Sequence, residues 1–275
     1  MPHMRVRDVE LYYERAGSGP TLLFIHGMCG DAEVWSDQVA RLSDRFDCIT
    51  YDRRGHTRST RGDEPESPHT HALDAAALIN AMDVTRPIVV GSSGGARITV
   101  ELARTHPELI GGVVISEPPI ASLAGDLGPA FMAEIAAAVR PAAEAGGPRA
   151  AVDAFFPLLC PGLWSGLDEA RRDRYRANGD MLLAEFAGAP LVLSEEDVSA
   201  IDVPALVVAG DGSHPALRLI ARVISRAMPD ARFVELAGSG HVTYAEQPAE
   251  FARAVAAFAG EIAALIEGSN SQGVM

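Results

Sequence analysis

One serine in the sequence stands in a pattern that is typical of a covalent nucleophile. Gly91, Ser93 and Gly95 form the motif G-x-S-x-G, in which a strand turns sharply into a helix and the serine hydroxyl points outward. Small residues are needed on both sides because a larger side chain would collide with the tight turn. The apolar run at 87–91 fits a buried strand, and residues 96–105 fit the helix that the motif requires. The sequence therefore predicts a nucleophile elbow at Ser93.

The elements that would position this serine are short apolar strands that alternate with helices. Residues 4–16 alternate polar and apolar side chains and fit an edge hairpin. Further strands are expected at 21–25, 46–52, 111–116, 205–210 and 232–236, and helices at 34–44, 70–84, 215–228 and 247–266. This alternation predicts an α/β fold whose mostly parallel sheet is covered by helices on both faces. The loops at the carboxyl ends of the strands are then expected to hold the site.

The pattern changes over residues 118–203, where alanine-rich helical stretches are separated by prolines and glycines, with no convincing strand. We interpret this segment as a helical cap that is inserted into the fold. The α/β core then comprises residues 1–117 and 204–266. The polar residues 267–275 are expected to form a flexible tail.

Composition and charge exclude several classes of protein. The chain has 275 residues, enough for a large core, and its 48% hydrophobic and 22% charged residues are ordinary for a soluble enzyme. The formal net charge of −14 disfavours nucleic acids and anionic membranes as partners. No apolar run is long enough to span a bilayer. The first residues lack the apolar core of a secretory signal, so we expect a cytoplasmic protein.

Neither a disulfide framework nor a cofactor is predicted. Cys29, Cys48 and Cys160 are odd in number and widely separated, which indicates free thiols. No glycine fingerprint for a nucleotide follows the first buried strand, and no cluster of metal ligands is evident in the sequence. The expected ligand is therefore a substrate without a cofactor.

Four motifs along the chain resemble those of the α/β-hydrolases. They are His26-Gly27, the turn YDRRGHTRS at 51–59, the elbow GSSGG at 91–95, and Gly240-His241. A serine that precedes the histidine, with a cap between the sixth and seventh strands, is the layout of this family. The resemblance covers nearly the whole chain. Thr57 departs from the pattern, since the family usually has glycine at this position in the turn.

The resemblance implies roles for individual residues. Ser93 is the expected nucleophile, and His241, in the loop after the last strand, is the expected base that takes its proton. The anion that forms when a serine attacks a carbonyl needs donors that are already directed at it. In this fold those donors are the backbone N–H groups of Met28 and Gly94.

Two carboxylates are candidates for the acid that orients the histidine. Most of the family carries an aspartate three residues beyond a glycine at the end of the seventh strand, and that position, three beyond Gly210, is Ser213. Asp211 directly follows the glycine and is also typical of a turn. Glu117, at the end of the sixth strand, is our first choice, because haloalkane dehalogenases and zearalenone-type lactonases carry the acid there. The GSSGG elbow and the SEPP turn are similar to those of the lactonases.

A serine nucleophile in this fold implies acyl transfer to water, since the related dehalogenases and epoxide hydrolases depend on an aspartate. The predicted substrate is a small hydrophobic ester or lactone that is cleaved through an acyl-enzyme. Bulky apolar residues in the cap favour such a ligand, and we expect contacts from Trp164 above all, and from Met28, Phe156 and Phe186. The alternatives are a cofactor-free haloperoxidase, a carbon–carbon bond hydrolase, and a receptor on a hydrolase fold.

Overall fold

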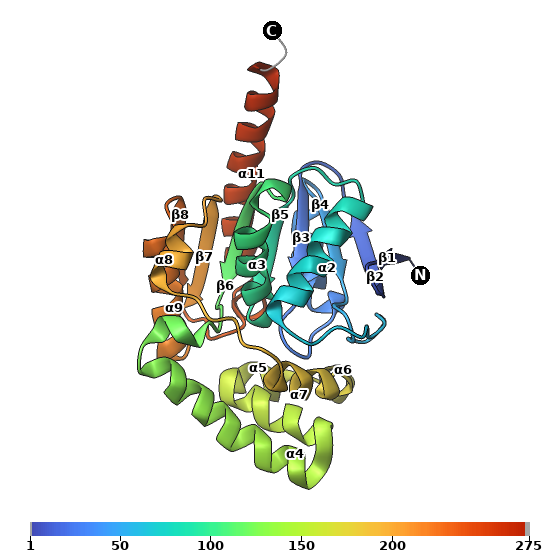
Figure 1. The fold of residues 1–275 in the computed structure, drawn as a ribbon, viewed down its shortest axis with the longest axis vertical. Helices are drawn as coiled ribbons and strands as arrows, with labels where there is room; N and C mark the ends of the chain where they lie inside the picture. The colour runs from blue at the N-terminus through green and yellow to red at the C-terminus, as the bar shows by residue number, and fades with distance from the viewer. Residues whose placement is uncertain (1, 273–275) are drawn as a thin grey trace.

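The computed structural model describes residues 2–272, which form an α/β fold around one eight-stranded sheet (Figure 1). The strand order is β1-β2-β4-β3-β5-β6-β7-β8. Strand β2 pairs antiparallel with both β1 and β4, and all the other neighbouring strands pair parallel. The strands are β1 (His3–Val6), β2 (Val9–Ala16), β3 (Thr21–Ile25), β4 (Asp47–Tyr51), β5 (Ile88–Ser92), β6 (Gly112–Ser116), β7 (Ala205–Gly210) and β8 (Ala231–Leu236). The predicted fold class is confirmed.

The central strands end at one level of the sheet. Every residue of β5, β6 and β7 is buried, as expected for parallel strands that are covered on both faces. Ser92, the last residue of β5, pairs with Ser116, the last residue of β6, and Ser116 pairs with Val208 of β7. The residues that directly follow these strands, Ser93 and Glu117, therefore begin side by side at the carboxyl edge of the sheet.

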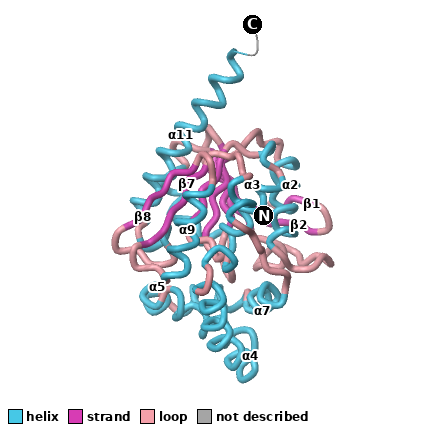
Figure 2. The backbone as a smooth tube through the Cα atoms, turned by 60° about the vertical axis from the view of Figure 1, so that its left-hand side comes forward, coloured by secondary structure: helices cyan, strands magenta, loops and turns pink. Residues whose placement is uncertain are grey.

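Helices cover both faces of the sheet (Figures 1 and 2). On one face α2 (Pro68–Ala81) packs on α3 (Gly94–Thr105), and on the other α1 (Ser36–Leu42) packs on α11 (Pro248–Gln272). A further helix, α9 (Pro215–Ala227), covers β7 and β8. It buries Ala216, Leu217, Ile220, Ala221 and Ile224. This helical spacing of apolar residues is what makes one face of α9 part of the core.

The segment between β6 and β7 is helical throughout its ordered elements, as predicted. It contains η3 (Ala121–Ala124), α4 (Leu127–Leu159), α5 (Pro161–Gly166), α6 (Glu169–Ala177), α7 (Gly179–Ala187) and α8 (Glu195–Ser199). Gly147 has φ 72° and divides α4 into two helices that meet at a bend. Helices α4 to α7, hereafter the insert helices, lie beyond the carboxyl ends of the strands, whereas α8 returns to the side of α9 (Figure 1). The shorter helices η1 (Ala32–Trp35), η2 (Pro107–Leu109) and α10 (Thr243–Glu246) lie in loops of the core.

The last helix is longer than the sequence suggested. Helix α11 continues to Gln272, six residues beyond the expected end at 266, and its last turns extend away from the body of the protein (Figure 2). No proline follows residue 266, and Gly268 costs a helix only about 1 kcal/mol relative to alanine. The first part of the expected tail, 267–272, is therefore helical, and residues 273–275 lie outside the described residues.

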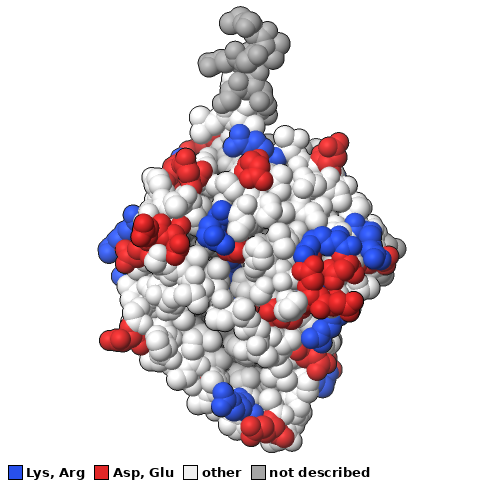
Figure 3. All heavy atoms as spheres, in the orientation of Figure 1, with Lys and Arg blue, Asp and Glu red and all other residues white. Residues whose placement is uncertain are grey.

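Charged side chains of both signs neighbour one another on the surface (Figure 3). Many form ion pairs, such as Arg7 with Glu64 at 2.5 Å and Arg218 with Glu235 at 3.0 Å. Exposed pairs of this kind contribute little to stability. Among the residues that the structure describes, no helix combines the length and the apolar composition needed to cross a membrane.

Candidate active site

Ser93 lies in the turn between β5 and α3, with backbone angles φ 54° and ψ −120°. Because residues with a Cβ rarely adopt a positive φ, this conformation is strained. Its neighbours hold it in place, since the Ser93 N–H donates to the Ser116 carbonyl at 2.9 Å and the Ser93 carbonyl accepts from the Ala96 N–H at 2.9 Å. A Cβ on Gly91 would lie 2.5 Å from the Gly95 carbonyl oxygen. The two glycines of the motif thus let strand and helix approach closely, which is the geometry of a nucleophile elbow.

His241 reaches this serine from the loop that follows β8. Its Nε2 lies 2.9 Å from the Ser93 hydroxyl oxygen, within hydrogen-bond distance of the proton that a base would remove. The loop is tied to the sheet by a buried hydrogen bond of 2.7 Å between the hydroxyls of Thr243 and Ser116. The carboxylate of Glu246 accepts the N–H of Gly240 in the same loop. The imidazole is therefore held against the elbow by contacts on both sides of it.

Glu117 lies on the other side of the imidazole. It directly follows β6, is fully buried, and has φ 55°. Its Oε1 accepts the Gly210 N–H at 2.8 Å, and its Oε2 accepts the Ser213 hydroxyl at 2.5 Å. The same Oε2 lies 3.3 Å from Nδ1 of His241. The structure thus brings Ser93, His241 and Glu117 into one chain of hydrogen bonds, and the buried carboxylate has donors on both oxygens.

Asp211, the reserve candidate for the acid, is placed differently. It is exposed, and its Oδ1 accepts the Gly238 N–H at 2.8 Å, which is the role of a turn aspartate. Ser213, at the position where most of the family has its aspartate, is buried and donates to Glu117. The sequence shows only that position 213 lacks the aspartate found in most of the family, and it gives no role for the serine. In the structure the Ser213 hydroxyl satisfies one oxygen of the buried Glu117 carboxylate.

The two expected oxyanion donors lie close together beside the elbow. Gly94 is the first residue of α3, so its N–H has no acceptor within the helix. A Cβ on Gly94 would lie 3.2 Å from the backbone nitrogen of Met28, which shows how closely the two segments approach. A Cβ on Gly27 would lie 3.7 Å from the Ser93 hydroxyl oxygen. Within residues 2–272 neither the Met28 nor the Gly94 N–H has a hydrogen-bond acceptor, so both can donate to a ligand.

Comparison with known proteins agrees with this geometry. A model of the alpha/beta hydrolase family matches residues 22–254. The chain belongs to this family. RutD of Azorhizobium caulinodans, which carries the name of a carbamate hydrolase, is 30% identical over 95% of this hydrolase and 99% of its own length. The 2-(acetamidomethylene)succinate hydrolase of Mesorhizobium japonicum is 27% identical over 91% of each chain.

A solved structure extends the likeness of this alpha/beta hydrolase to three dimensions. The enol-lactonase of Burkholderia xenovorans superposes with a TM-score of 0.77 at 25% identity. The match covers 94% of this hydrolase and 99% of the lactonase. The inserted helices are thus part of a fold that is shared over nearly the whole chain.

This hydrolase has a buried ionic cluster that could not be predicted from the sequence. Glu185, on α7 of the insert, accepts from Arg53 of the core at 2.7 Å and from Arg97 of α3 at 3.1 Å. Arg53 is fully buried and also donates to the carbonyl of Gly27, next to Met28, the expected oxyanion donor. Burial alone would raise the pKa of Glu185, but Arg53, His56 and Arg97 outweigh it and hold that pKa well below the usual value. One insert carboxylate therefore links the two segments that carry the expected oxyanion donors, Met28 and Gly94.

The buried histidines near this cluster predict how stability depends on pH. Burial, assisted by Arg53, lowers the pKa of His26 well below 6.5 and also lowers that of His71. The folded protein therefore keeps these rings neutral at a pH where the unfolded chain takes up protons. The resulting stability is present above pH 6.5 and is lost as the pH falls below it. Glu185, with its lowered pKa, adds a loss of the same sign below about pH 4.5.

We therefore expect the midpoint of thermal unfolding to be nearly constant from pH 8 to 7 and to fall steadily from pH 6.5 to 5. Unfolding scans at constant ionic strength measure this directly. The variant His71→Gln removes one of the two neutral rings and should flatten the slope below pH 6.5. A midpoint that stays constant or rises between pH 7 and 5 would contradict the assignment of buried neutral histidines.

A second insert residue holds the turn in which the sequence departs from its family. Thr57 has φ 42°, a conformation that glycine adopts freely and a β-branched residue does not. Asn178, between α6 and α7, accepts the Thr57 N–H at 2.9 Å and donates to the carbonyls of Cys29 and Gly30 at 3.0 Å each. This asparagine thus joins the insert to the turn and to the loop of residues 26–30, hereafter the oxyanion loop, and it stabilises the strained threonine.

The Ser93 side chain borders a small space between the core and the insert. Of the four residues that were expected to contact the substrate, two line this space and two do not. Met28 and Phe156 line this space. Trp164 and Phe186 do not: the Trp164 ring stacks on Phe156 with centroids 4.8 Å apart, and Phe186 packs on Phe155 at 5.8 Å. Both therefore support the wall from behind. The sequence cannot separate Phe156 from Trp164 and Phe186, because all three are bulky apolar residues of the same helical segment.

The three cysteines are free and buried. Burial raises the pKa of Cys48 and of Cys160 to about 12, and that of Cys29 well above its usual value. At neutral pH these thiols are protonated and inert as nucleophiles. Within the described part of the chain, no group of histidine, cysteine and carboxylate side chains has the arrangement of a metal site.

Proposed function

We propose that the chain is a serine hydrolase that cleaves a carboxylic ester or lactone of a hydrophobic substrate. The observation that carries this proposal is the hydrogen-bonded chain from Ser93 through His241 to Glu117, with His241 Nε2 2.9 Å from the serine oxygen. Acyl transfer also needs hydrogen-bond donors for the developing oxyanion, and the free N–H groups of Met28 and Gly94 beside the serine supply them.

In the first half of the proposed reaction, the Ser93 oxygen attacks the substrate carbonyl while His241 Nε2 takes its proton. Negative charge moves to the carbonyl oxygen, where the N–H groups of Met28 and Gly94 stabilise it. Glu117 keeps the Nδ1 proton in place and stabilises the imidazolium without becoming protonated itself. The carbon–oxygen bond to the alcohol then breaks, and His241 returns the proton to the leaving oxygen.

In the second half, water replaces the alcohol. His241 takes a proton from the water, whose oxygen attacks the acyl carbon of the Ser93 ester. Collapse of this intermediate returns the proton to Ser93 and releases the acid. The same residues serve both halves, and no cofactor is part of the proposal.

The apolar lining of the site supports a hydrophobic substrate. Phe155, Phe156, Leu159 and Leu163 of the insert form most of the wall opposite Ser93, as in pockets for small apolar ligands. The enol-lactonase and the hydrolases named above support acyl transfer as the reaction class. Within that class we propose esters or lactones. A zearalenone-type macrolactone is included because the GSSGG and SEPP motifs resemble those of the corresponding lactonases.

Covalent labelling tests the proposal. A fluorophosphonate probe should label the folded protein at Ser93, and peptide mapping should locate the adduct on that residue. The variant Ser93→Ala should lose both the labelling and the hydrolysis of a small aryl ester, by about 10⁶-fold in kcat as for other serine nucleophiles. Folded protein that neither takes the probe nor hydrolyses the ester would favour a receptor.

The remaining alternatives use the same two side chains and differ in the substrates they accept. A perhydrolase or haloperoxidase would turn over only in the presence of peroxide, and a carbon–carbon bond hydrolase would cleave a diketone but leave esters intact. A parallel assay of an ester, a lactone and a diketone, each with and without peroxide, separates these outcomes. Hydrolysis of the ester or lactone without peroxide supports the proposal.

A further inference from the structure

A second cavity adjoins the space around Ser93. The inner space has a volume of only about 40 Å³, whereas its neighbour, hereafter the outer chamber, measures about 430 Å³. Gly30, Leu163, Tyr175 and Tyr244 line both, so the two spaces lie on either side of these residues. Sites for small molecules span about 300–1,000 Å³. Only the outer chamber is large enough to hold the bulk of a substrate.

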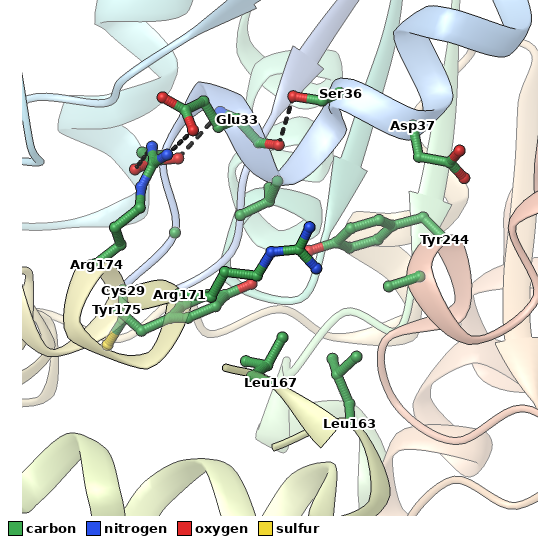
Figure 4. Close-up of a pocket in the computed structure, with 14 residues that line it drawn as sticks. Cys29, Glu33, Ser36, Asp37, Leu163, Leu167, Arg171, Arg174, Tyr175 and Tyr244 are labelled. Carbon is green, nitrogen blue, oxygen red and sulfur yellow. Dashed lines mark hydrogen bonds and ion pairs between the residues drawn. The ribbon is translucent and has the colours of Figure 1, made fainter. Parts of the chain in front are cut away.

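The outer chamber suits a neutral apolar group. Val34, Leu163 and Leu167 line it together with the rings of Tyr175 and Tyr244. Figure 4 shows Leu163 and Leu167 on one side of it and the helix that bears Ser36 on the other. These apolar groups share the wall with the charged residues Asp31, Glu33, Asp37, Arg171 and Arg174, whose pairing decides whether a neutral ligand fits.

The charged groups of the outer chamber compensate one another. Arg174 pairs with Asp31 at 2.6 Å and with Glu33 (Figure 4). Asp37 pairs with Arg41 at 2.9 Å. Arg171, whose side chain is 72% exposed, lies 3.8 Å from Asp168. Asp31, Glu33, Asp37 and Arg174 are therefore paired, whereas the largely exposed Arg171 makes this one long contact with Asp168.

The position of the catalytic histidine indicates which half of the substrate enters the outer chamber. Tyr244 and Ala245, three and four residues after His241, form part of its wall. The leaving oxygen must lie close to Nε2 of His241, because it receives its proton from that atom. A leaving group that extends along the 241–245 segment therefore enters the chamber, whereas the acyl group remains in the inner space.

We infer that the outer chamber binds the alcohol part of the substrate, and that the enzyme selects esters of short acyl groups with a bulky, neutral, apolar alcohol. This inference rests on the proposed ester hydrolysis and adds its orientation. The acyl group is limited to the few atoms that the inner space accepts beside Ser93. The alcohol is a ring system or branched chain that fits about 430 Å³.

Two isomeric esters test the orientation. 2-Naphthylmethyl acetate has a small acyl group and a bulky alcohol, and methyl 2-naphthylacetate has the same atoms with the two sizes exchanged. Both leaving groups are primary alcohols of similar acidity, so the comparison reports binding. The expected result is a kcat/KM at least about tenfold higher for 2-naphthylmethyl acetate, the lower range for a size difference in an apolar pocket. A preference for methyl 2-naphthylacetate would overturn the inference.

A variant that fills the outer chamber gives a second test. Leu167 lines this chamber and not the inner space, so Leu167→Trp should lower the ratio of kcat/KM for 2-naphthylmethyl acetate to that for methyl acetate about tenfold or more. Leu127→Trp, at an exposed insert position that lines neither cavity, is the matched control. If Leu167→Trp does not fold, Val34→Trp fills the chamber from the core side.

These measurements separate the inference from the function on which it rests. Wild-type protein that hydrolyses methyl acetate, but shows no preference between the isomers or no response to either chamber variant, refutes the orientation alone. Wild-type protein that hydrolyses neither methyl acetate nor the isomers, and is not labelled at Ser93, refutes the hydrolase proposal and the orientation with it.

Discussion

Replacing Glu117 with glutamine is expected to lower kcat about 10³–10⁴-fold. An amide can offer its N–H to Nδ1 of His241, which selects the wrong imidazole tautomer, and it no longer stabilises the cation that forms during proton transfer. The corresponding Asp-to-Asn change in a Ser-His-Asp triad lowers kcat by about 10⁴. Hydrolysis of a small aryl ester by the purified variant measures the effect, with KM expected to change little.

Asp211→Asn is the matched control for this substitution. Its carboxylate is exposed and accepts only the Gly238 N–H among the contacts described above, so kcat should stay within about threefold of wild type. A threefold change in kcat corresponds to only about 0.65 kcal/mol in the activation free energy. If Asp211→Asn were as damaging as Ser93→Ala while Glu117→Gln were not, the choice of acid would be wrong.

A rescue variant distinguishes the electrostatic role of Glu117 from a structural one. Ser213 donates to Glu117 Oε2 at 2.5 Å, and that oxygen lies 3.3 Å from His241. A carboxylate at position 213 can therefore reach the imidazole once Glu117 is neutral. The double variant Glu117→Gln with Ser213→Asp is expected to recover at least about tenfold of the lost kcat. Glu117→Gln with Ser213→Asn, which has the same shape without the charge, should recover none.

Replacing Glu185 with glutamine is expected to have the largest effect on stability. The change leaves Arg53 and Arg97 buried without their carboxylate, and breaking a buried ion pair from one side costs about 3–5 kcal/mol. The free energy of unfolding in urea measures this loss. Glu144→Gln, at an exposed position of α4, is the matched control and should change it by less than about 0.5 kcal/mol.

Activity gives this variant a second readout. Arg53 donates to the carbonyl of Gly27, whose neighbour Met28 carries one oxyanion donor. If Glu185 holds that loop, kcat should fall at temperatures where the variant is fully folded, by up to the 10²–10³-fold that the loss of one donor costs. A variant that is destabilised but has wild-type kcat when folded would show that Glu185 serves stability alone.

The sequence predicted the parts of this molecule that depend on local patterns. The continuous apolar runs at 87–91 and 205–210 identified buried strands, because strands covered on both faces have no polar positions. The small residues around Ser93 identified the elbow, because only they permit its close strand-helix approach. The order of four motifs then placed Ser93, His241 and the oxyanion loop at one edge of the sheet.

What the sequence could not predict depends on contacts between distant residues. Arg53 and Glu185 are 132 positions apart and meet only when the insert folds back on the core. Neither residue belongs to a motif that specifies a buried pair. In the same way, Trp164 and Phe156 have the same hydrophobic signal, and only packing decides that Phe156 lines the site and Trp164 supports it. The end of α11 was placed too early because Gly268 and the polar residues that follow it are typical of a helix end, although the helix continues to Gln272.

The position of Glu117 constrains where the insert of this protein can be replaced by the insert of a relative. The residue is fully buried at the end of β6, and the chain leaves the core for the insert immediately after it. A chimaera that receives a foreign insert must therefore be joined after residue 117, and the new segment must accept the left-handed backbone of that glutamate. Moving the junction upstream of residue 117 would remove the carboxylate that lies 3.3 Å from Nδ1 of His241.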